Sequence, residues 1–290
     1  MWARRLWVAE NGLLRTPWRL LLFILVAAVA TFVVTGLVQP LVSATWELTG
    51  ARLVLFGWLQ VIGLLIAHYA MLRRLDRLPW VASGLHRQGA RPDLLVRGAL
   101  LGVCGIGIPA AILWGIGWLR VEPQPEGSSL VEGARIALAL VPLAFLEELM
   151  IRGYPLTVLR GVLDWRLAVL ATSVVFGLLH WWNPGATAWS LTLVTLAGLM
   201  LGTIVVVTGS LYAATAAHVG WNWMMAGVLH ANVSGLQFAT PDYRMVDAGP
   251  DWATGGSWGP EGGAGAALGM CAATAYLYAR WRRRAEPVHD

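Results

Sequence analysis

The chain contains 290 residues, of which 57% are hydrophobic and only 13% are charged, with a mean hydropathy of +0.62. Soluble domains carry about twice this charged fraction, so the composition excludes an ordinary soluble protein and indicates an integral membrane protein. The formal net charge of +5 comes from arginines that lie beside apolar stretches. Membrane topology explains such arginines, and we expect no nucleic-acid partner.

Eight apolar stretches are long enough to cross a bilayer, which predicts an all-α, polytopic membrane helical bundle. They cover residues 19–38, 52–72, 94–119, 133–153, 165–182, 188–208, 210–230 and 263–281. The fourth stretch is the least apolar, because Glu132, Arg135 and a pair of glutamates interrupt it. The first is too long for the core of a signal peptide, so we interpret it as a retained helix.

The predicted helices divide the chain into three parts. These are residues 1–132 with the first three helices and their connecting segments, residues 133–230 with helices four to seven as a catalytic core, and residues 231–290 with an outer loop, the last helix and a basic cytoplasmic tail. The loop, residues 231–262, is rich in Gly, Pro, Asp and Trp, which is typical of irregular structure. Cys104 and Cys271 lie in apolar stretches without a second Cys or His at ligand spacing, so we expect small core residues rather than a disulfide or a zinc pair.

The distribution of arginine predicts the orientation. With the N-terminus inside, seventeen of the 21 arginines fall on inner segments. The four outer ones are Arg52, Arg120, Arg135 and Arg244. Because positive residues are retained on the cytoplasmic side, we expect both termini in the cytoplasm and the protein in the inner (plasma) membrane of a bacterium.

Three short motifs place ionisable or amide groups inside these apolar helices. A charge near the bilayer centre costs about 3 kcal/mol even on lenient scales, so such groups need partners or a function. The motifs are Glu147-Glu148-x-x-x-Arg152, Phe176-x-x-x-His180 and His218-x-x-x-Asn222.

The two adjacent glutamates are expected to have different roles. Neighbours on a helix point about 100° apart, so both cannot face one spot in the same way. Glu148 and Arg152 are four residues apart in the order that favours an ion pair, and we expect a structural pair. This pairing leaves Glu147 as the carboxylate without a cation, which suits a general base or acid.

Two of the six histidines share a helix face with another motif residue. Phe176 and His180 share a helix face, as do His218 and Asn222, which have small residues around them. A lone histidine in a span is usually a packing residue, and this is our interpretation of His68. His230, at a span end, is expected at the membrane interface.

The helix lengths predict that two of the motifs meet. The turn of the hairpin formed by the fourth and fifth spans is expected near residues 161–164. Glu147 and His180 both lie roughly 23–26 Å from it at 1.5 Å per residue. We expect Pro155 to kink the first arm and the cluster to lie toward the cytoplasmic side.

Two chemistries remain open for this cluster. In the first, Glu147 and His180 activate a water, while His218 and Asn222 stabilise the oxyanion of a cleaved amide. In the second, a divalent metal such as Zn²⁺ is held by Glu147, His180 and His218, and its bound water attacks. We favour the first, because neither histidine has a carboxylate near it in the sequence to orient a metal-bound ring. The His-Glu-x-x-His, Gly-x-Ser-x-Gly and Walker A motifs are absent from the sequence.

The three motifs, in this order on successive spans, resemble those of the CPBP family of CAAX prenyl endopeptidases and bacteriocin-processing relatives, whose core is also called the ABI domain. The resemblance covers about residues 133–230. It implies an intramembrane endopeptidase whose site opens toward the cytoplasm, with Glu147 and His180 as the water-activating pair and His218 and Asn222 as oxyanion donors. Glu148, Arg152 and Phe176 would support them. The family label of metalloprotease leaves the use of a metal open.

Two other functions compete with the protease. A non-proteolytic immunity or scaffold protein of the same fold would bind a peptide without cutting it. A proton-coupled transporter also places Glu and His inside spans, but it predicts repeat symmetry that the sequence does not show. As partners we expect the lipid bilayer and a peptide or membrane-protein substrate, and the sequence indicates no oligomeric state.

Overall fold

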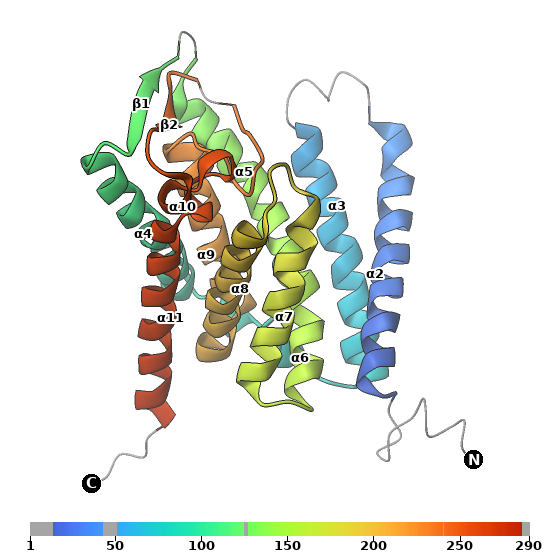
Figure 1. Ribbon diagram of the computed structural model, residues 1–290. Coiled ribbons are helices and arrows are strands. Elements are labelled where there is room, and N and C mark those ends of the chain that lie inside the picture. Colours follow the sequence, from blue (N-terminus) through green and yellow to red (C-terminus); the bar gives the residue numbers. More distant parts are fainter. Residues whose placement is uncertain (1–13, 43–50, 125–126, 240, 286–290) are drawn as a thin grey trace.

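The protein is a bundle of long helices with one small sheet at one end, seen in a computed structural model that describes residues 14–42, 51–124, 127–239 and 241–285 (Figure 1). The longer helices are α2 (Thr16–Val38), α3 (Ala51–His68), α4 (Pro92–Gly115), α5 (Ser129–Glu148), α6 (Tyr154–Arg160), α7 (Trp165–Leu179), α8 (Ala188–Thr208), α9 (Leu211–Trp223) and α11 (Ala264–Ala285). The strands are β1 (Leu119–Pro123) and β2 (Tyr243–Asp247), and a short helix α10 spans Asp251–Thr254.

Shorter helical turns extend or connect these elements. Three of them are π-helical and continue a preceding α-helix, namely η3 (Tyr69–Leu75), η6 (Leu149–Gly153) and η8 (Met224–Val228). The 3₁₀ turns are η1 (Gln39–Leu41), η4 (Trp80–Ser83), η5 (Arg87–Ala90), η7 (His180–Trp182), η9 (Gly256–Trp258) and η10 (Pro260–Gly262).

Six helices within the described residues are long and apolar enough to cross a membrane. They run over Thr16–Leu41, Ala51–Leu75, Pro92–Gly115, Ser129–Arg160, Trp165–Trp182 and Ala188–Thr208. This confirms the predicted all-α membrane bundle. The expected count of eight is not confirmed, because α9 has only 13 residues before its π turn and α11 is not among the six.

Small residues let the helices approach closely. Gly98 and Gly102 of α4 face the carbonyl oxygens of Ala213 and Ala217 on α9, where a Cβ has no room. Side chains that would separate the two backbones are therefore excluded at these positions.

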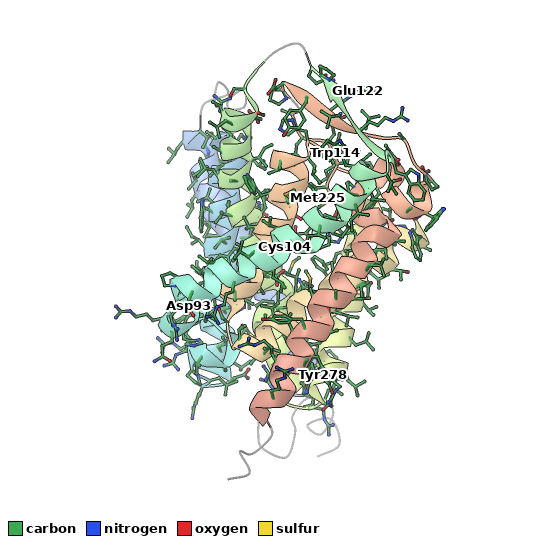
Figure 2. The ribbon with its side chains drawn as sticks, turned by 90° about the vertical axis from the view of Figure 1, so that its left-hand side faces the viewer. Asp93, Cys104, Trp114, Glu122, Met225 and Tyr278 are labelled. Carbon is green, nitrogen blue, oxygen red and sulfur yellow. The ribbon has the colours of Figure 1, made fainter. Side chains whose placement is uncertain are left out.

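The outer face of α4 shows where one expectation was wrong. Figure 2 follows α4 from Asp93 past Cys104 to Trp114, with α11 crossing beside it. Cys104 and Cys271 are free thiols, as expected, but both are exposed rather than packed in the core. Helix geometry turns these two positions away from the bundle, which the apolar character of their neighbours did not reveal.

The long arm that carries the first motif contains a π turn, η6, shortly before Pro155. Pro155 lacks an N–H and disfavours a regular helix around it, and η6 ends just before it, at Gly153. The N–H of Tyr154 donates a hydrogen bond to Nε2 of His68 at 2.9 Å, while Nδ1 of His68 donates to the Leu64 carbonyl at 2.8 Å. His68 is thus a satisfied, buried packing residue, as expected.

The segment after α9 is more ordered than a loop. It contains β2, which pairs antiparallel with β1 from Leu119 opposite Asp247 to Pro123 opposite Tyr243, and it continues through α10 and two 3₁₀ turns. The third predicted span therefore stops short of residue 119, because the chain leaves the helix after Gly115 to form this strand. The pairing joins segments more than a hundred residues apart, which a local pattern cannot reveal.

Candidate active site

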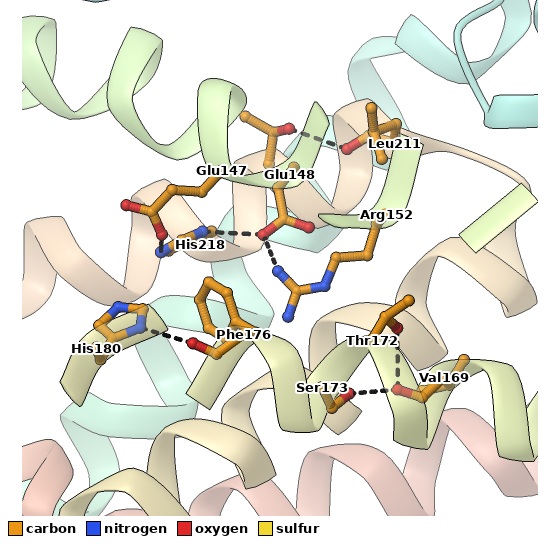
Figure 3. A network of polar contacts seen from close by, with 11 residues as sticks. Glu147, Glu148, Arg152, Val169, Thr172, Ser173, Phe176, His180, Leu211 and His218 are labelled. Atoms are coloured by element: carbon orange, nitrogen blue, oxygen red, sulfur yellow. Dashed lines mark hydrogen bonds and ion pairs between the residues drawn. The ribbon is translucent and has the colours of Figure 1, made fainter. Parts of the chain in front are cut away.

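The three motifs converge in the interior of the bundle. Glu147 and Glu148 end α5, and Arg152 lies in the π turn that follows. Phe176 lies in the last turn of α7 and His180 begins η7 directly after it, whereas His218 and Asn222 belong to α9. Figure 3 shows the labelled motif side chains from these segments pointing toward one another, namely Glu147, Glu148, Arg152, Phe176, His180 and His218.

Glu148 is the centre of a buried polar network. Its Oε1 accepts a hydrogen bond from Arg152 Nη1 at 2.9 Å, which confirms the predicted pair, and lies 3.0 Å from His218 Nδ1 (Figure 3). The side chains of Glu148 and Arg152 are both fully buried. A buried charge is costly unless it is paired. Glu148 is paired with both Arg152 and His218, so it links the first motif to the third.

The guanidinium of Arg152 rests on the ring of Phe176. The Arg152 Cζ lies 4.1 Å from the ring centroid, which is close enough for a cation–π interaction. Nε and Nη2 of Arg152 have no hydrogen-bond partner among the described residues. The ring face of Phe176 therefore supplies part of the stabilisation that hydrogen-bond acceptors would otherwise give these two donors. The same ring contacts His180 and His218, with centroids 4.8 and 6.0 Å apart.

Glu147 lies at the edge of this network. Its side chain is 34% exposed, and its Oε2 lies 3.8 Å from His218 Nε2, beyond hydrogen-bond distance. Among the described residues that oxygen has no hydrogen-bond partner. Glu147 therefore keeps an acceptor available at the edge of the cavity, whereas Oε1 of Glu148 is shared by Arg152 and His218 and only its Oε2 lacks a hydrogen-bond partner among the described residues.

The tautomer of His180 follows from its backbone contact. Nδ1 donates to the carbonyl oxygen of Phe176 at 2.8 Å (Figure 3). A neutral imidazole that donates through Nδ1 carries its lone pair on Nε2. His180 can accordingly accept a hydrogen bond through Nε2.

One cavity joins the predicted catalytic residues. It has a volume of about 350 Å³ and is lined by Glu147, His180, His218 and Asn222. Its other lining residues are Met150, Phe176, Leu179, Asn183, Ser234 and Leu236. A smaller cavity of about 30 Å³ lies beside it, between His218, Trp221 and Glu261. The four predicted side chains thus face one space that can hold a water and part of a peptide.

The residues at the site fit a metal poorly. Within the described parts of the chain, no three His, Cys, Asp or Glu side chains converge as a ligand set. Nδ1 of His218 is engaged by Glu148 and Nδ1 of His180 by a carbonyl, contacts that metal-bound histidines also make, so the expectation that no carboxylate lies near either histidine was wrong for His218. The proposed set of Glu147, His180 and His218 nevertheless does not converge in this arrangement, and we derive no catalytic step through a metal.

Sequence reasoning missed three residues at the site, namely Asn183, Ser234 and Glu261. They line the cavities but lie outside the motifs, on the turn between α7 and α8 and on the segment after α9. Asn183 Nδ2 donates to the Ser234 carbonyl at 2.9 Å, and both N–H and Oγ of Ser234 bond to Glu261. The one signal in the sequence was Glu261, a single glutamate in a Gly-rich segment. Charged residues are rarely buried without partners, so its burial indicates a specific role.

Part of the cavity wall lies toward one end of the bundle. Asn183, Ser234 and Leu236 come from segments at the end of the bundle opposite the start of α2 and the end of α11 (Figure 1). The sequence analysis placed both termini and the opening on the cytoplasmic side, whereas these wall segments lie at the end opposite the start of α2 and the end of α11. The side of the membrane to which the cavity opens stays a prediction.

Comparison with known proteins agrees with the motifs. The model of the type II CAAX prenyl endopeptidase Rce1-like family matches residues 131–224, which include every residue of the three motifs. No curated protein and no solved structure matches the chain. Six apolar helices and this match together indicate a membrane-embedded hydrolase. The resemblance read from the motifs is confirmed by this match, which covers residues 131–224 of the 290-residue chain.

Proposed function

We propose that this protein is an intramembrane endopeptidase that hydrolyses a peptide bond in a membrane-associated or hydrophobic peptide. Glu147 and His180 activate a water, and His218 and Asn222 stabilise the oxyanion. The observation that carries this proposal is the cavity of about 350 Å³ that all four side chains line.

The first step uses the available acceptors on one side of the cavity. A water held between the Glu147 carboxylate and Nε2 of His180 gives a proton to Glu147 as its oxygen attacks the carbonyl carbon of the substrate. The tetrahedral intermediate then collapses with cleavage of the C–N bond. Glu147 returns the proton to the leaving amine, so that one water is consumed for each bond cut.

The second part of the site stabilises the oxyanion, and its charges support this role. Nδ1 of His218 faces Glu148, so a hydrogen-bond donor at Nε2 requires the doubly protonated imidazolium. Carboxylates on both sides favour that form, with Glu147 3.8 Å from Nε2. Two carboxylates then balance the two cations His218 and Arg152, which suits a cluster at membrane depth. Asn222 supplies the second, neutral donor.

The substrate and the location remain parts of this proposal. We place the protein in the inner membrane of a bacterium with both termini in the cytoplasm, from the arginine bias. In that orientation the cavity receives its substrate at the outer side of the membrane. A prenylated protein is then not the natural substrate, and a hydrophobic or membrane-bound peptide is.

Mass spectrometry of candidate peptides incubated with the wild type and with Glu147→Ala tests the function. We expect new fragments with the wild type only. The non-proteolytic scaffold and the proton-coupled transporter both predict intact peptides with either protein. If the biological effect of the protein survives in a folded Glu147→Ala variant, those functions are favoured over the protease.

A further inference from the structure

A buried acid outside the three motifs lies next to the site. Glu261, on η10 just before α11, accepts three hydrogen bonds. Trp221 Nε1 donates to its Oε2 at 3.0 Å, and the N–H and Oγ of Ser234 donate to its Oε1, each at 2.6 Å. No cation pairs with Glu261 within the described residues, so these three neutral donors compensate its burial.

Ser234 lies in a tight turn whose backbone is unusual. Val233 and Leu236 exchange two backbone hydrogen bonds, at 2.8 and 2.9 Å, around the central residues Ser234 and Gly235. The φ angles of these central residues are 49° and 77°. Positive φ at both positions is the pattern of a type I′ turn, which favours Asn and Gly. A serine here is disfavoured, and such strain often marks a functional position.

The turn is fixed from several directions. The carbonyl of Ser234 accepts a hydrogen bond from Asn183 at 2.9 Å, and the N–H of Gly235 donates to the Trp258 carbonyl at 3.0 Å. Gly235 also packs against the Pro184 carbonyl, where a Cβ has no room. The turn 233–236 is therefore held in one position relative to the α7–α8 turn.

This fixed turn lines the same cavity as the catalytic groups. Ser234 and Leu236 lie in its wall together with Glu147 and His180. Ser234 also lines the smaller cavity, together with Glu261. The segment after α9 therefore contributes directly to the space where a substrate would bind.

We propose that Glu261 is a positioning residue for substrate binding, which holds the turn 233–236 so that Ser234 contacts the peptide beside the scissile bond. This inference rests on the proposed protease function. Because the Ser234 hydroxyl donates its hydrogen to Glu261, its lone pairs accept a hydrogen bond from a peptide N–H of the substrate. Glu261 itself touches no reacting atom.

The partners of Glu261 explain why a carboxylate is needed. Trp221 Nε1 and the Ser234 backbone N–H can only donate, and they approach opposite oxygens. A glutamine of the same shape would place its own NH₂ group against one of these donors. Glu261→Gln therefore breaks the hydrogen bond from Trp221 or the backbone hydrogen bond from Ser234, and it does so without creating a cavity.

The first experiment needs no substrate. Hydrogen exchange is measured by mass spectrometry over residues 229–239 in the wild type, in Glu261→Gln and in Glu122→Gln, an exposed acid on β1 that pairs with Arg244. We expect exchange in this segment to become roughly tenfold faster in Glu261→Gln, as an order of magnitude for one lost charge-assisted hydrogen bond. Exchange in α5 and α7 should not change in Glu261→Gln. In the control Glu122→Gln, exchange over residues 229–239 should stay at the wild-type rate. Unchanged exchange in Glu261→Gln would overturn the anchoring role.

The second experiment tests the contact with substrate. Ser234→Gly removes the hydroxyl, keeps both backbone hydrogen bonds and suits the positive φ. The probes are synthetic peptides joined to an apolar anchor of about 20 residues. We expect KM to rise roughly two- to tenfold, the effect of one neutral hydrogen bond, with little change in kcat. Glu261→Gln should raise KM in the same direction, whereas Glu122→Gln should not.

The outcomes separate the two proposals. Cleavage by the wild type with an unchanged KM in Ser234→Gly overturns the positioning role and leaves the protease standing. A Ser234→Gly variant with a lower kcat and an unchanged KM also overturns the positioning role. No cleavage of any peptide by folded wild type overturns the protease and the positioning role together, while the exchange experiment still decides whether Glu261 anchors the turn.

Discussion

Oε1 of Glu148 lies 3.0 Å from Nδ1 of His218, although the two residues are 70 positions apart in the chain. The acid that the sequence assigned to a structural pair with Arg152 therefore also sets the orientation of a predicted oxyanion donor. One fully buried oxygen serves both partners, so the stability of the bundle and the geometry of the site depend on the same atom.

Glu147→Gln is expected to remove peptide cleavage while the protein stays folded. Its side chain is 34% exposed, and its Oε2 makes no hydrogen bond among the described residues and only a long contact of 3.8 Å with His218, so the folded state loses little when the charge is removed. Loss of a general base lowers the rate by about 10²–10⁴-fold. The measurement is kcat together with the melting temperature in detergent, with Glu132→Gln on the same helix as the control. Full cleavage by the folded Glu147→Gln variant would exclude this residue from the mechanism.

Arg152→Ala is expected to destabilise the protein. The substitution leaves Glu148 buried without its cation, and breaking a buried pair costs about 3–5 kcal/mol. Arg135→Ala is a matched control on the same arm, since its side chain is 70% exposed and its ion pair with Glu132 is long at 3.5 Å. That control should change stability by about 0.5 kcal/mol or less. Equal melting temperatures for the two variants would contradict the importance of the buried pair.

Gly153→Ala tests the π turn that separates Glu148 from α6. A Cβ at Gly153 would collide with the His68 ring, which accepts the hydrogen bond of the Tyr154 N–H. Overpacking of this kind costs about 1–3 kcal/mol. Gly36→Ala in α2 is the control, because no atom lies near the new Cβ, and it should stabilise that helix by about 0.5–1 kcal/mol. A Gly153→Ala variant as stable as the wild type would show that His68 moves without cost.

Cysteine labelling decides the orientation. In a variant that lacks Cys104 and Cys271, we expect a membrane-impermeant reagent to label Ser257→Cys from outside intact cells and not to label Arg160→Cys. Both positions are exposed and lie at opposite ends of the bundle. The reverse pattern would refute the arginine-based orientation and would place the cavity opening on the cytoplasmic side.

Metal analysis of the purified protein tests the preference for a mechanism in which Glu147 is the base. We expect activity to survive chelation, because no three ligating side chains converge within the described residues. The measurement combines the zinc content with activity after chelation and after zinc is added back. Stoichiometric zinc, with activity lost on removal and restored on return, would make Glu147, His180 and His218 ligands instead.

The sequence by itself determined the class of the protein and the identity of the motif residues. Long apolar stretches can satisfy their backbone groups in a bilayer only as helices, so composition alone predicted the helical bundle. The spacing of four residues predicted the Glu148–Arg152 pair and the contact of Phe176 with His180, because helix geometry puts such positions on one face. Both of these relationships are local.

Only the tertiary structure decided what depends on long-range contacts. It joined Glu148 to His218, paired β1 with β2, and brought Ser234 and Glu261 to the wall of the cavity. It also put the α7–α8 turn and the segment after α9, which supply part of the cavity wall, at the end opposite the start of α2 and the end of α11. Helix periodicity fixes which side of one helix a residue occupies, but contacts between distant segments depend on how helices and connecting segments pack. The Gly-rich segment 231–262 has no periodicity from which its hydrogen bonds could be predicted, so its part in the site emerged only in three dimensions.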